Sequence, residues 1–198
     1  MELKNYQIQV IRDLERFLEL LIEKQSISSA YSTLWNEKGV NVGIDGMPPY
    51  KTELAGVPQV CFKVPTGGGK TFLAANSIKP IFDSMPHIHP KAVVWLVPSD
   101  AILTQTYRTL TDKNHDYRKK IDVDFGNKVE IYSKQQLLNG QNFNPTSVSD
   151  NLSVFVLSYD SFRTSKKDGR KAYQENGSLL PFVRFKQDSG CLLYTSPS

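Results

Sequence analysis

The sequence predicts an α/β fold in which helices flank a mostly parallel sheet. Short apolar runs rich in valine and aromatic residues alternate with segments of helical periodicity. A glycine-rich turn joins one of these runs to the helix that follows it. Alternating strands and helices are typical of parallel sheets, because helices carry the crossover connections. The chain has 198 residues, of which 39% are hydrophobic, so it can bury one sizeable core.

The first part of the chain predicts one long helix and then a long connection. Apolar residues recur at helical spacing over residues 4–24, which predicts an amphipathic helix. Its apolar stripe consists of Val10, Ile11, Leu14, Phe17, Leu18, Leu21 and Ile22. Residues 26–58 lack periodicity and are rich in glycine and proline, so we expect a long loop with a short helix near 31–35.

The remainder of the chain alternates between strand-like and helix-like segments. The apolar run at 57–64 predicts a buried strand that leads into the glycine-rich turn. After it we expect a helix at 71–82 that Pro80 disturbs or ends, strands at 91–98, 128–133 and 152–159, a helix from Asp100 to about Leu110, and a polar loop at 139–151.

Composition and charge exclude several classes of protein. No apolar run reaches the ~18–20 residues that a membrane helix needs. The polar start MELKNYQIQV does not resemble a secretion signal, so a cytoplasmic protein without membrane contact is expected. The net charge of +4 permits nucleic-acid binding without arguing for it. The basic run at 118–120 is predicted to be a solvated loop.

Isolated reactive residues do not form a metal or disulfide framework. Cys61 and Cys191 have no ligand spacing, and Cys61 lies in an apolar run, so we expect a small buried core residue. His87 and His89 stand beside prolines, which favours a solvated loop over a metal site.

The turn at 64–71 reads V-P-T-G-G-G-K-T and fits the end of the phosphate-loop pattern, with Val64 where the pattern has glycine. Glycines let backbone N–H groups approach phosphate closely, and a following helix offers its positive end to the same anion. Lys70 is suited to the β- and γ-phosphates of ATP, and Thr71 to Mg²⁺. The candidate nucleotide-binding residues of the loop are Thr66, Gly67, Gly68, Gly69, Lys70 and Thr71, with Lys70 and Thr71 as the catalytic pair. A glycine-rich turn with a chance lysine is the alternative.

Three further stretches resemble the motifs of superfamily-two helicases, in the family's order. LKNYQIQVI at 3–11 resembles the element in which a glutamine reads adenine, which implies this role for Gln7. VVWLVPSDAILTQ at 93–105 and SVFVLSYDSFR at 153–163 are similar to the two segments that hold the nucleic-acid backbone. The resemblance implies nucleic-acid contacts at Ser99, Gln105, Ser158, Tyr159 and Arg163. An exposed helix glutamine, and a helix capped by Ser99 or Asp100, are the structural alternatives.

The lead into the loop, PPYKTELAGVPQVCFKVPTGGGKT at 48–71, resembles the Res (motor) subunit of type III restriction enzymes. This resemblance implies a RecA-like domain of an ATP-dependent DNA helicase or translocase, in a complex with a modification (methyltransferase) subunit; RNA is not excluded as the track. The expected organisation is an N-terminal helix with the adenine-reading element at 1–25, an insertion at 26–58, a partial RecA-like domain at 59–190 and a non-native tail at 191–198.

The resemblance also shows what the chain lacks. The family has a D-E-x-H-type motif whose aspartate holds Mg²⁺ and whose glutamate activates water, yet no Asp-Glu dipeptide occurs in this sequence. A second RecA-like domain with its arginine finger is missing as well. We therefore expect an N-terminal fragment that binds ATP but hydrolyses little of it. A small phosphoryl-transfer enzyme such as a nucleotide kinase, and a non-catalytic nucleotide-binding module, are the alternatives.

Overall fold

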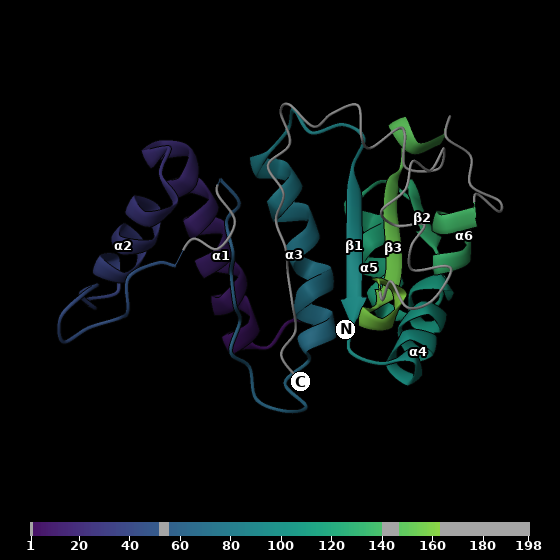
Figure 1. The fold of residues 1–198 in the computed structure, drawn as a ribbon, viewed down its shortest axis with the longest axis horizontal. Helices are drawn as coiled ribbons and strands as arrows, with labels where there is room; N and C mark the ends of the chain where they lie inside the picture. The colour runs from purple at the N-terminus through teal and green to yellow at the C-terminus, as the bar shows by residue number, and fades with distance from the viewer. Residues whose placement is uncertain (1, 52–55, 140–146, 163–198) are drawn as a thin grey trace. The chain divides into compact units, whose positions relative to one another are not determined.

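The computed structural model describes residues 2–51, 56–139 and 147–162. The chain forms two compact units, of which the first extends to Pro86 and the second begins at His87. Each unit is described by itself, and Figure 1 shows their elements in chain order. Arg163 and the tail at 191–198 lie outside the described residues. No helix in the described ranges is long and apolar enough to cross a membrane.

The first unit is built on α1 (Asn5–Lys24), which packs against both other helices of the unit, α2 and α3. The helix predicted at 4–24 is confirmed. Ile11 belongs to one apolar cluster, with Val64 and Leu73, whereas Phe17 and Leu20 belong to a second cluster near α2. Burying two sides of α1 explains why its apolar stripe is broad. Ile22 was expected in this stripe, but it is 61% exposed.

The segment 26–58 contains a longer helix than expected, α2 (Ile27–Glu37). The Ser26 hydroxyl caps it by accepting a hydrogen bond from the Ser29 N–H. Only Ala30 of this helix is buried, and it packs in the cluster with Phe17 and Leu20. Ile27, Tyr31 and Leu34 are partly buried against the same cluster, so α2 presents a short apolar stripe to it. This stripe, the contacts with α1 and the serine cap stabilise a helix longer than the one predicted.

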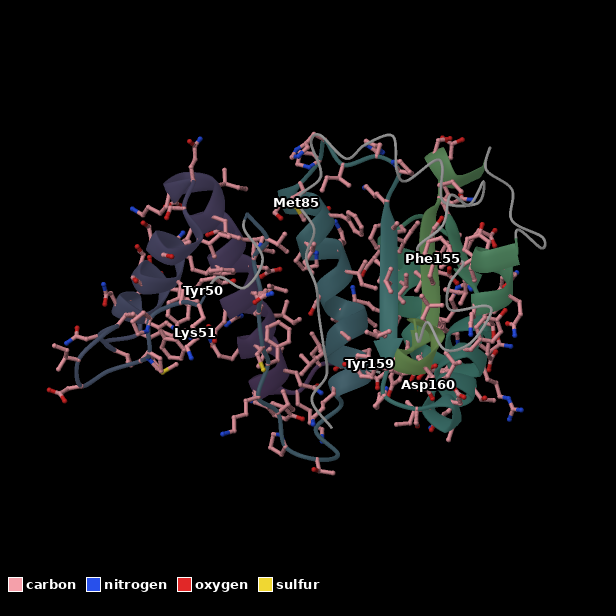
Figure 2. All side chains as sticks on the ribbon, in the orientation of Figure 1. Tyr50, Lys51, Met85, Phe155, Tyr159 and Asp160 are labelled. Atoms are coloured by element: carbon pink, nitrogen blue, oxygen red, sulfur yellow. The ribbon has the colours of Figure 1, made fainter. Side chains whose placement is uncertain are left out.

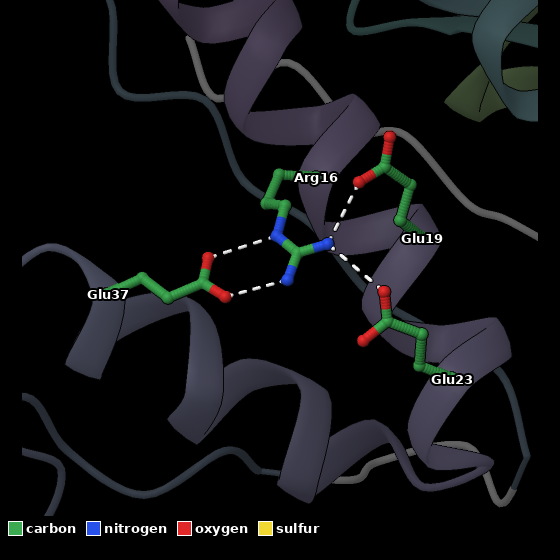
Figure 3. A network of polar contacts seen from close by, with 4 residues as sticks. All are labelled: Arg16, Glu19, Glu23 and Glu37. Atoms are coloured by element: carbon green, nitrogen blue, oxygen red, sulfur yellow. Dashed lines mark hydrogen bonds and ion pairs between the residues drawn. The ribbon is translucent and has the colours of Figure 1, made fainter.

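Arg16 on α1 joins the two helices through a fork of ion pairs (Figure 3). Its guanidinium donates to both carboxylate oxygens of Glu37 on α2, at 3.0 and 2.7 Å. The same guanidinium donates to Glu19 at 2.9 Å and to Glu23 at 3.2 Å. The hydrogen bonds that Glu37 accepts from Arg16 hold the pKa of Glu37 below its ordinary value. The carboxylates of Glu37, Glu19 and Glu23 in turn raise the pKa of Arg16.

Glu37→Gln is expected to lower the Tm of the first unit slightly at neutral pH. A depressed folded-state pKa means that the stabilisation is present above the unfolded-state pKa, near 4.5, and is lost as pH falls through the lower folded-state value. The Tm difference from the unmodified chain should therefore vanish in acid and shrink with added salt. In a Trp95→Phe background, Trp35 fluorescence reports α2 melting, and Glu15→Gln, at an exposed position of α1, is the control. An equal Tm difference at neutral and acid pH would contradict the assignment.

The prediction of a buried strand at 57–64 is wrong. These residues form no strand ladder, and only one of them is in an isolated bridge. Their side chains pack instead, with Val60 against the α1–α2 cluster and Val64 against Ile11 and Leu73. Because this segment does not belong to a sheet, no neighbouring strand or sheet face of the described chain covers its side chains. Cys61 is therefore exposed, whereas we predicted that it is buried.

Helix α3 (Lys70–Ser84) follows the glycine-rich turn and continues through Pro80. We predicted that Pro80 disturbs or ends the helix. The helix does not end at Pro80, so that part of the prediction is wrong. Proline removes one N–H and its hydrogen bond to the carbonyl four residues earlier. The buried side chains of Phe72, Leu73 and Phe82 lie on both sides of this position, so packing stabilises the helix across it.

The second unit contains a three-stranded parallel sheet in the order β1-β3-β2. Its strands are β1 (Ala92–Val97), β2 (Val129–Tyr132) and β3 (Leu152–Ser158). The three predicted strands in this part of the chain are confirmed, and so is the expectation of a parallel sheet flanked by helices. Every residue of the central strand β3 is buried, which explains why its sequence is apolar apart from Ser153 and Ser158.

The helices of the second unit are α4 (Asp100–Thr111), α5 (Asp116–Asp124) and α6 (Lys134–Asn139). Short 3₁₀ turns occupy Ser147–Ser149 (η1) and Tyr159–Phe162 (η2). Helix α4 was predicted, and it packs against all three strands. Helices α5 and α6 were not. The prediction of a solvated loop at 118–120 is wrong, because these residues lie in α5 and Arg118 is buried. His87 and His89 lie exposed in a loop, as expected.

Candidate functional site

The phosphate loop is a tight turn that ends as the N-terminus of α3. The Gly68 N–H donates to the Pro65 carbonyl at 2.9 Å, which closes the turn. Gly67 and Gly69 have φ angles of +74° and +73°, in the left-handed region that glycine adopts at little cost. Gly69 is the N-cap of α3, and its carbonyl accepts the Leu73 N–H at 2.9 Å. The glycines at these positions are therefore required by the backbone.

Val64 anchors the loop to the core of the first unit. It stands where the general pattern has glycine, and it is only 8% exposed, in a cluster with Ile11 and Leu73. A Cβ added to Gly68 would lie 2.5 Å from Val64 Cγ1. Valine can thus replace the usual glycine at position 64 because Gly68, which lies against it, has no side chain.

Two side chains of α1 contact the loop directly. Tyr6 Oη donates to the Gly68 carbonyl at 2.8 Å, and Gln7 Nε2 donates to the same oxygen at 3.0 Å. Gln7 Oε1 accepts the Lys4 N–H at 2.9 Å. Gln7 is 4% exposed, so the structural alternative of an ordinary exposed helix glutamine is wrong. The sequence element that carries Gln7 therefore lies against the phosphate loop.

The remaining loop residues suit an anionic ligand. Thr66 and Gly67 are exposed, and Gly68, Gly69, Lys70 and Thr71 are half-buried. Lys70 and Thr71 open α3, whose first turn has no acidic side chain, so the positive end of the helix is not neutralised there. Within the described residues no group of three or more His, Cys, Asp or Glu could hold a metal.

In the second unit, the two segments expected to hold nucleic acid meet at one edge of the sheet. In the parallel register Val97 pairs with Ser158, so β1 and β3 end side by side. Ser158 Oγ donates to Asp100 Oδ1 at 2.8 Å, and the Ser158 N–H donates to Ser161 Oγ at 3.2 Å. Ser158 is 2% exposed. Ser158 is therefore inside the protein and not at a surface that nucleic acid can reach. Its hydroxyl joins the end of β3 to the start of α4.

The other candidates in this unit are more accessible. Ser99 is exposed and caps α4, with its hydroxyl 3.5 Å from the Ile102 N–H. Gln105 is exposed on α4, and Tyr159 is 47% exposed where η2 leaves β3 (Figure 2). Since Ser99 is the helix cap, the structural alternative for this residue holds. It does not exclude a contact with phosphate, because exposed N–H groups at a helix start also bind anions.

Comparison with known proteins decides the family. A family model described as "Type III restriction enzyme, res subunit" matches residues 1–181. The chain belongs to this family. No curated protein and no solved structure matches the chain.

Membership of the Res family confirms the resemblance found in the sequence. The family implies a RecA-like fold and the N-terminal region of a DEAD-like helicase ATPase, as in restriction enzyme res subunits. It also implies ATP as the nucleotide and suggests nucleic-acid binding. The three-stranded parallel sheet flanked by helices agrees with such a fold.

Two residues at these sites were not identified as site residues from the sequence. Tyr6 has no role in the sequence-based predictions, and its hydroxyl bond to Gly68 spans 62 positions of the chain. Asp100 was considered only as a cap of the helix that it starts, yet its carboxylate accepts a hydrogen bond from the Ser158 hydroxyl. Each contact depends on tertiary packing, and a single sequence without pairing information carries no signal for it.

Proposed function

We propose that this chain is the N-terminal ATP-binding part of an ATP-dependent DNA helicase or translocase, as a Res-like subunit of a type III restriction enzyme. One observation carries the proposal. The Gly-Gly-Gly-Lys-Thr turn has left-handed glycines at the start of α3 and is held by Gln7 of α1, the residue to which we assign the reading of adenine, in a chain of the Res family. A complex with a modification (methyltransferase) subunit is part of the proposal.

In this proposal each end of ATP has its own residues. The backbone N–H groups at Gly67 and Gly69 donate to the phosphates, Gly68 lets them approach closely because it has no side chain, and Lys70 neutralises the β- and γ-phosphate charge. Thr71 supplies a hydroxyl ligand to Mg²⁺, which the phosphates also bind. The Gln7 amide can make two more hydrogen bonds beyond those to Lys4 and Gly68, one as donor and one as acceptor, which matches the adenine edge.

Hydrolysis in this proposal needs groups that the 198 residues do not contain. The chain has no Asp-Glu dipeptide to hold Mg²⁺ and activate water. An arginine finger from a second motor domain is worth ~10³–10⁵ in rate in related phosphoryl-transfer enzymes. We therefore expect this chain to bind Mg·ATP weakly and to turn it over negligibly, with or without DNA.

The proposed track is DNA, held by its backbone. Tyr159 is exposed directly after the end of β3, where parallel α/β sheets commonly bind ligands, and Gln105 is exposed on α4, the helix that follows β1. The N–H groups at the start of α4, beside Ser99, are further donors. Contacts of this kind do not read sequence, so binding should be similar on different DNA sequences and should weaken with salt.

Gln105→Ala is expected to weaken DNA binding about two- to tenfold, equally on two unrelated DNA sequences, because one hydrogen bond to the backbone is lost. Fluorescence anisotropy with labelled single-stranded DNA, duplex DNA and RNA of matched length measures this. Gln9→Ala is the matched control, since Gln9 is also an exposed helix glutamine but lies on α1. Equal losses for the two variants, or loss on one DNA sequence only, would count against the proposed track.

A small phosphoryl-transfer enzyme would behave differently in assays of ATP turnover and DNA binding. It would turn over ATP steadily with a small acceptor and would ignore DNA. A non-catalytic nucleotide-binding module would bind ATP and never hydrolyse it, even when a second motor domain is supplied. Robust DNA-stimulated hydrolysis by this chain alone would contradict the proposed dependence on groups that it lacks.

A further inference from the structure

One carbonyl of the phosphate loop carries an unusual share of the contacts with α1. The Gly68 oxygen accepts hydrogen bonds from Tyr6 Oη at 2.8 Å and from Gln7 Nε2 at 3.0 Å. A carbonyl oxygen has two lone pairs, so both bonds can form at once. Both donors lie in the first turn of α1, more than sixty residues before the loop. The position of the Gly68 carbonyl therefore depends on α1 as well as on the loop residues themselves.

The donors are themselves held in place. Gln7 Oε1 accepts the Lys4 N–H at the start of α1, which leaves Nε2 directed at the loop. The fit is close, since a Cβ added to Gly69 would lie 2.6 Å from Gln7 Nε2 and one added to Gly68 would lie 3.4 Å from Tyr6 Oη. A side chain at Gly69 would therefore collide with Gln7, whereas at Gly68 the approach to Tyr6 is ordinary van der Waals contact and the collision is with Val64 Cγ1, at 2.5 Å.

Holding a carbonyl also orients the N–H group of the same peptide. In a trans peptide the N–H points opposite to the C=O. With the Gly68 oxygen held against α1, the Gly69 N–H points away from α1. Between glycines a peptide can rotate at little cost, so without the two donors this orientation would have to be selected at each binding event.

We propose that Tyr6 is a positioning residue for the phosphate loop. Together with Gln7 it holds the Gly68 carbonyl, so that the Gly69 N–H is presented to the phosphates before the nucleotide arrives. The inference rests on the proposed binding of ATP by this loop, and it adds a residue that does not itself touch the ligand. Tyr6 is 42% exposed, so loss of its hydroxyl should affect the loop more than the core.

Tyr6→Phe tests the inference, with Mg·ATP and inorganic tripolyphosphate as probes in titration calorimetry on the full chain. Loss of one of two donors should weaken both probes equally, by about two- to tenfold, because the defect lies at the phosphates. Tyr6→Phe with Gln7→Leu should weaken tripolyphosphate by more than the product of the single effects, since only the double variant frees the carbonyl. Tyr31→Phe is the matched control, because Tyr31 also donates to a backbone carbonyl, that of Pro48, at 3.1 Å.

A spectroscopic measurement reads the peptide itself. The sequence has only two Gly-Gly peptides, Gly67–Gly68 and Gly68–Gly69, so a carbonyl-to-amide NMR correlation on chain labelled with ¹³C′,¹⁵N-glycine shows two signals. Tyr6→Phe should shift the Gly68–Gly69 signal, and Tyr31→Phe should leave both unchanged.

The outcomes separate the inference from the proposal beneath it. If the unmodified chain binds neither probe, the proposed function fails and the inference fails with it. If the unmodified chain binds and Tyr6→Phe binds equally well, or changes affinity without moving the Gly68–Gly69 signal, the inference alone is overturned. A weakened affinity together with a shifted signal supports it, and an unchanged Tm in the same variant shows that folding is not the cause.

Discussion

Lys70→Ala is expected to lower the affinity of the chain for Mg·ATP by about a hundredfold or more. Hydrogen bonds to charged groups contribute ~1.5–3 kcal/mol each, and in the proposed site Lys70 serves two phosphates. The change should leave the fold intact, because Lys70 opens α3 and alanine is the best helix former. Calorimetric titration with Mg·ATP measures the affinity, and circular dichroism measures the helix content.

The control for this prediction is a second lysine beside the loop. Lys63 is exposed and lies one residue before Val64, so Lys63→Ala removes the same charge outside the loop. We expect it to change the affinity less than about twofold, since an exposed charge at that distance is screened by salt. Equal losses for Lys63→Ala and Lys70→Ala would mean that general charge attraction, rather than the loop, binds the nucleotide.

The parts of the site that follow local rules could be predicted from the sequence. The glycine-rich turn and the helix predicted at 71–82 depend on residues next to one another, and the structure has a turn with left-handed Gly67 and Gly69 followed by a helix that begins at Lys70. Strand β3 was predicted for a similar reason, because all its residues are buried and its sequence is apolar apart from Ser153 and Ser158.

The parts that depend on pairing across the chain could not be predicted. The apolar run at 57–64 has strand-like composition, but a strand exists only through a partner, and none forms a ladder with it in the described chain. The burial of Gln7 and Ser158 depends on Gly68 and Asp100, which lie 61 and 58 positions away. A single polar residue in a sequence does not show whether its partner is water or the protein.

Arg118 is the clearest example, and its removal should have the largest effect on stability. The residue stands in a charged stretch that resembles a solvated loop, yet it is 6% exposed. Its guanidinium donates to Asp122 at 2.8 Å, to the Leu110 carbonyl at 3.2 Å and to the Val129 carbonyl at 3.0 Å. One side chain thus joins the end of α4, the helix α5 and the start of β2.

Arg118→Ala is expected to destabilise the second unit by about 3–5 kcal/mol, because it leaves a largely buried carboxylate without its partner. Loss of this size is a large fraction of the ~5–15 kcal/mol that stabilises a typical domain. Urea unfolding followed by Trp95 on β1, in a Trp35→Phe background, measures the free energy of unfolding for this unit. Arg108→Ala, at an exposed arginine in the last turn of α4, is the matched control and should cost less than about 1 kcal/mol.

The double variant Arg118→Met with Asp122→Leu separates charge from hydrogen bonding. Replacing a buried ion pair by apolar residues is often neutral, so the double variant should regain much of the stability lost in Arg118→Ala. Recovery should stop short of the unmodified chain, because the carbonyls of Leu110 and Val129 still lose their donor, at about 1 kcal/mol or more each. If Arg118→Ala costs no more than Arg108→Ala, the guanidinium does not hold α4, α5 and β2 together. If the double variant is as unstable as the single one, the two carbonyl bonds rather than the charge pair account for the stabilisation.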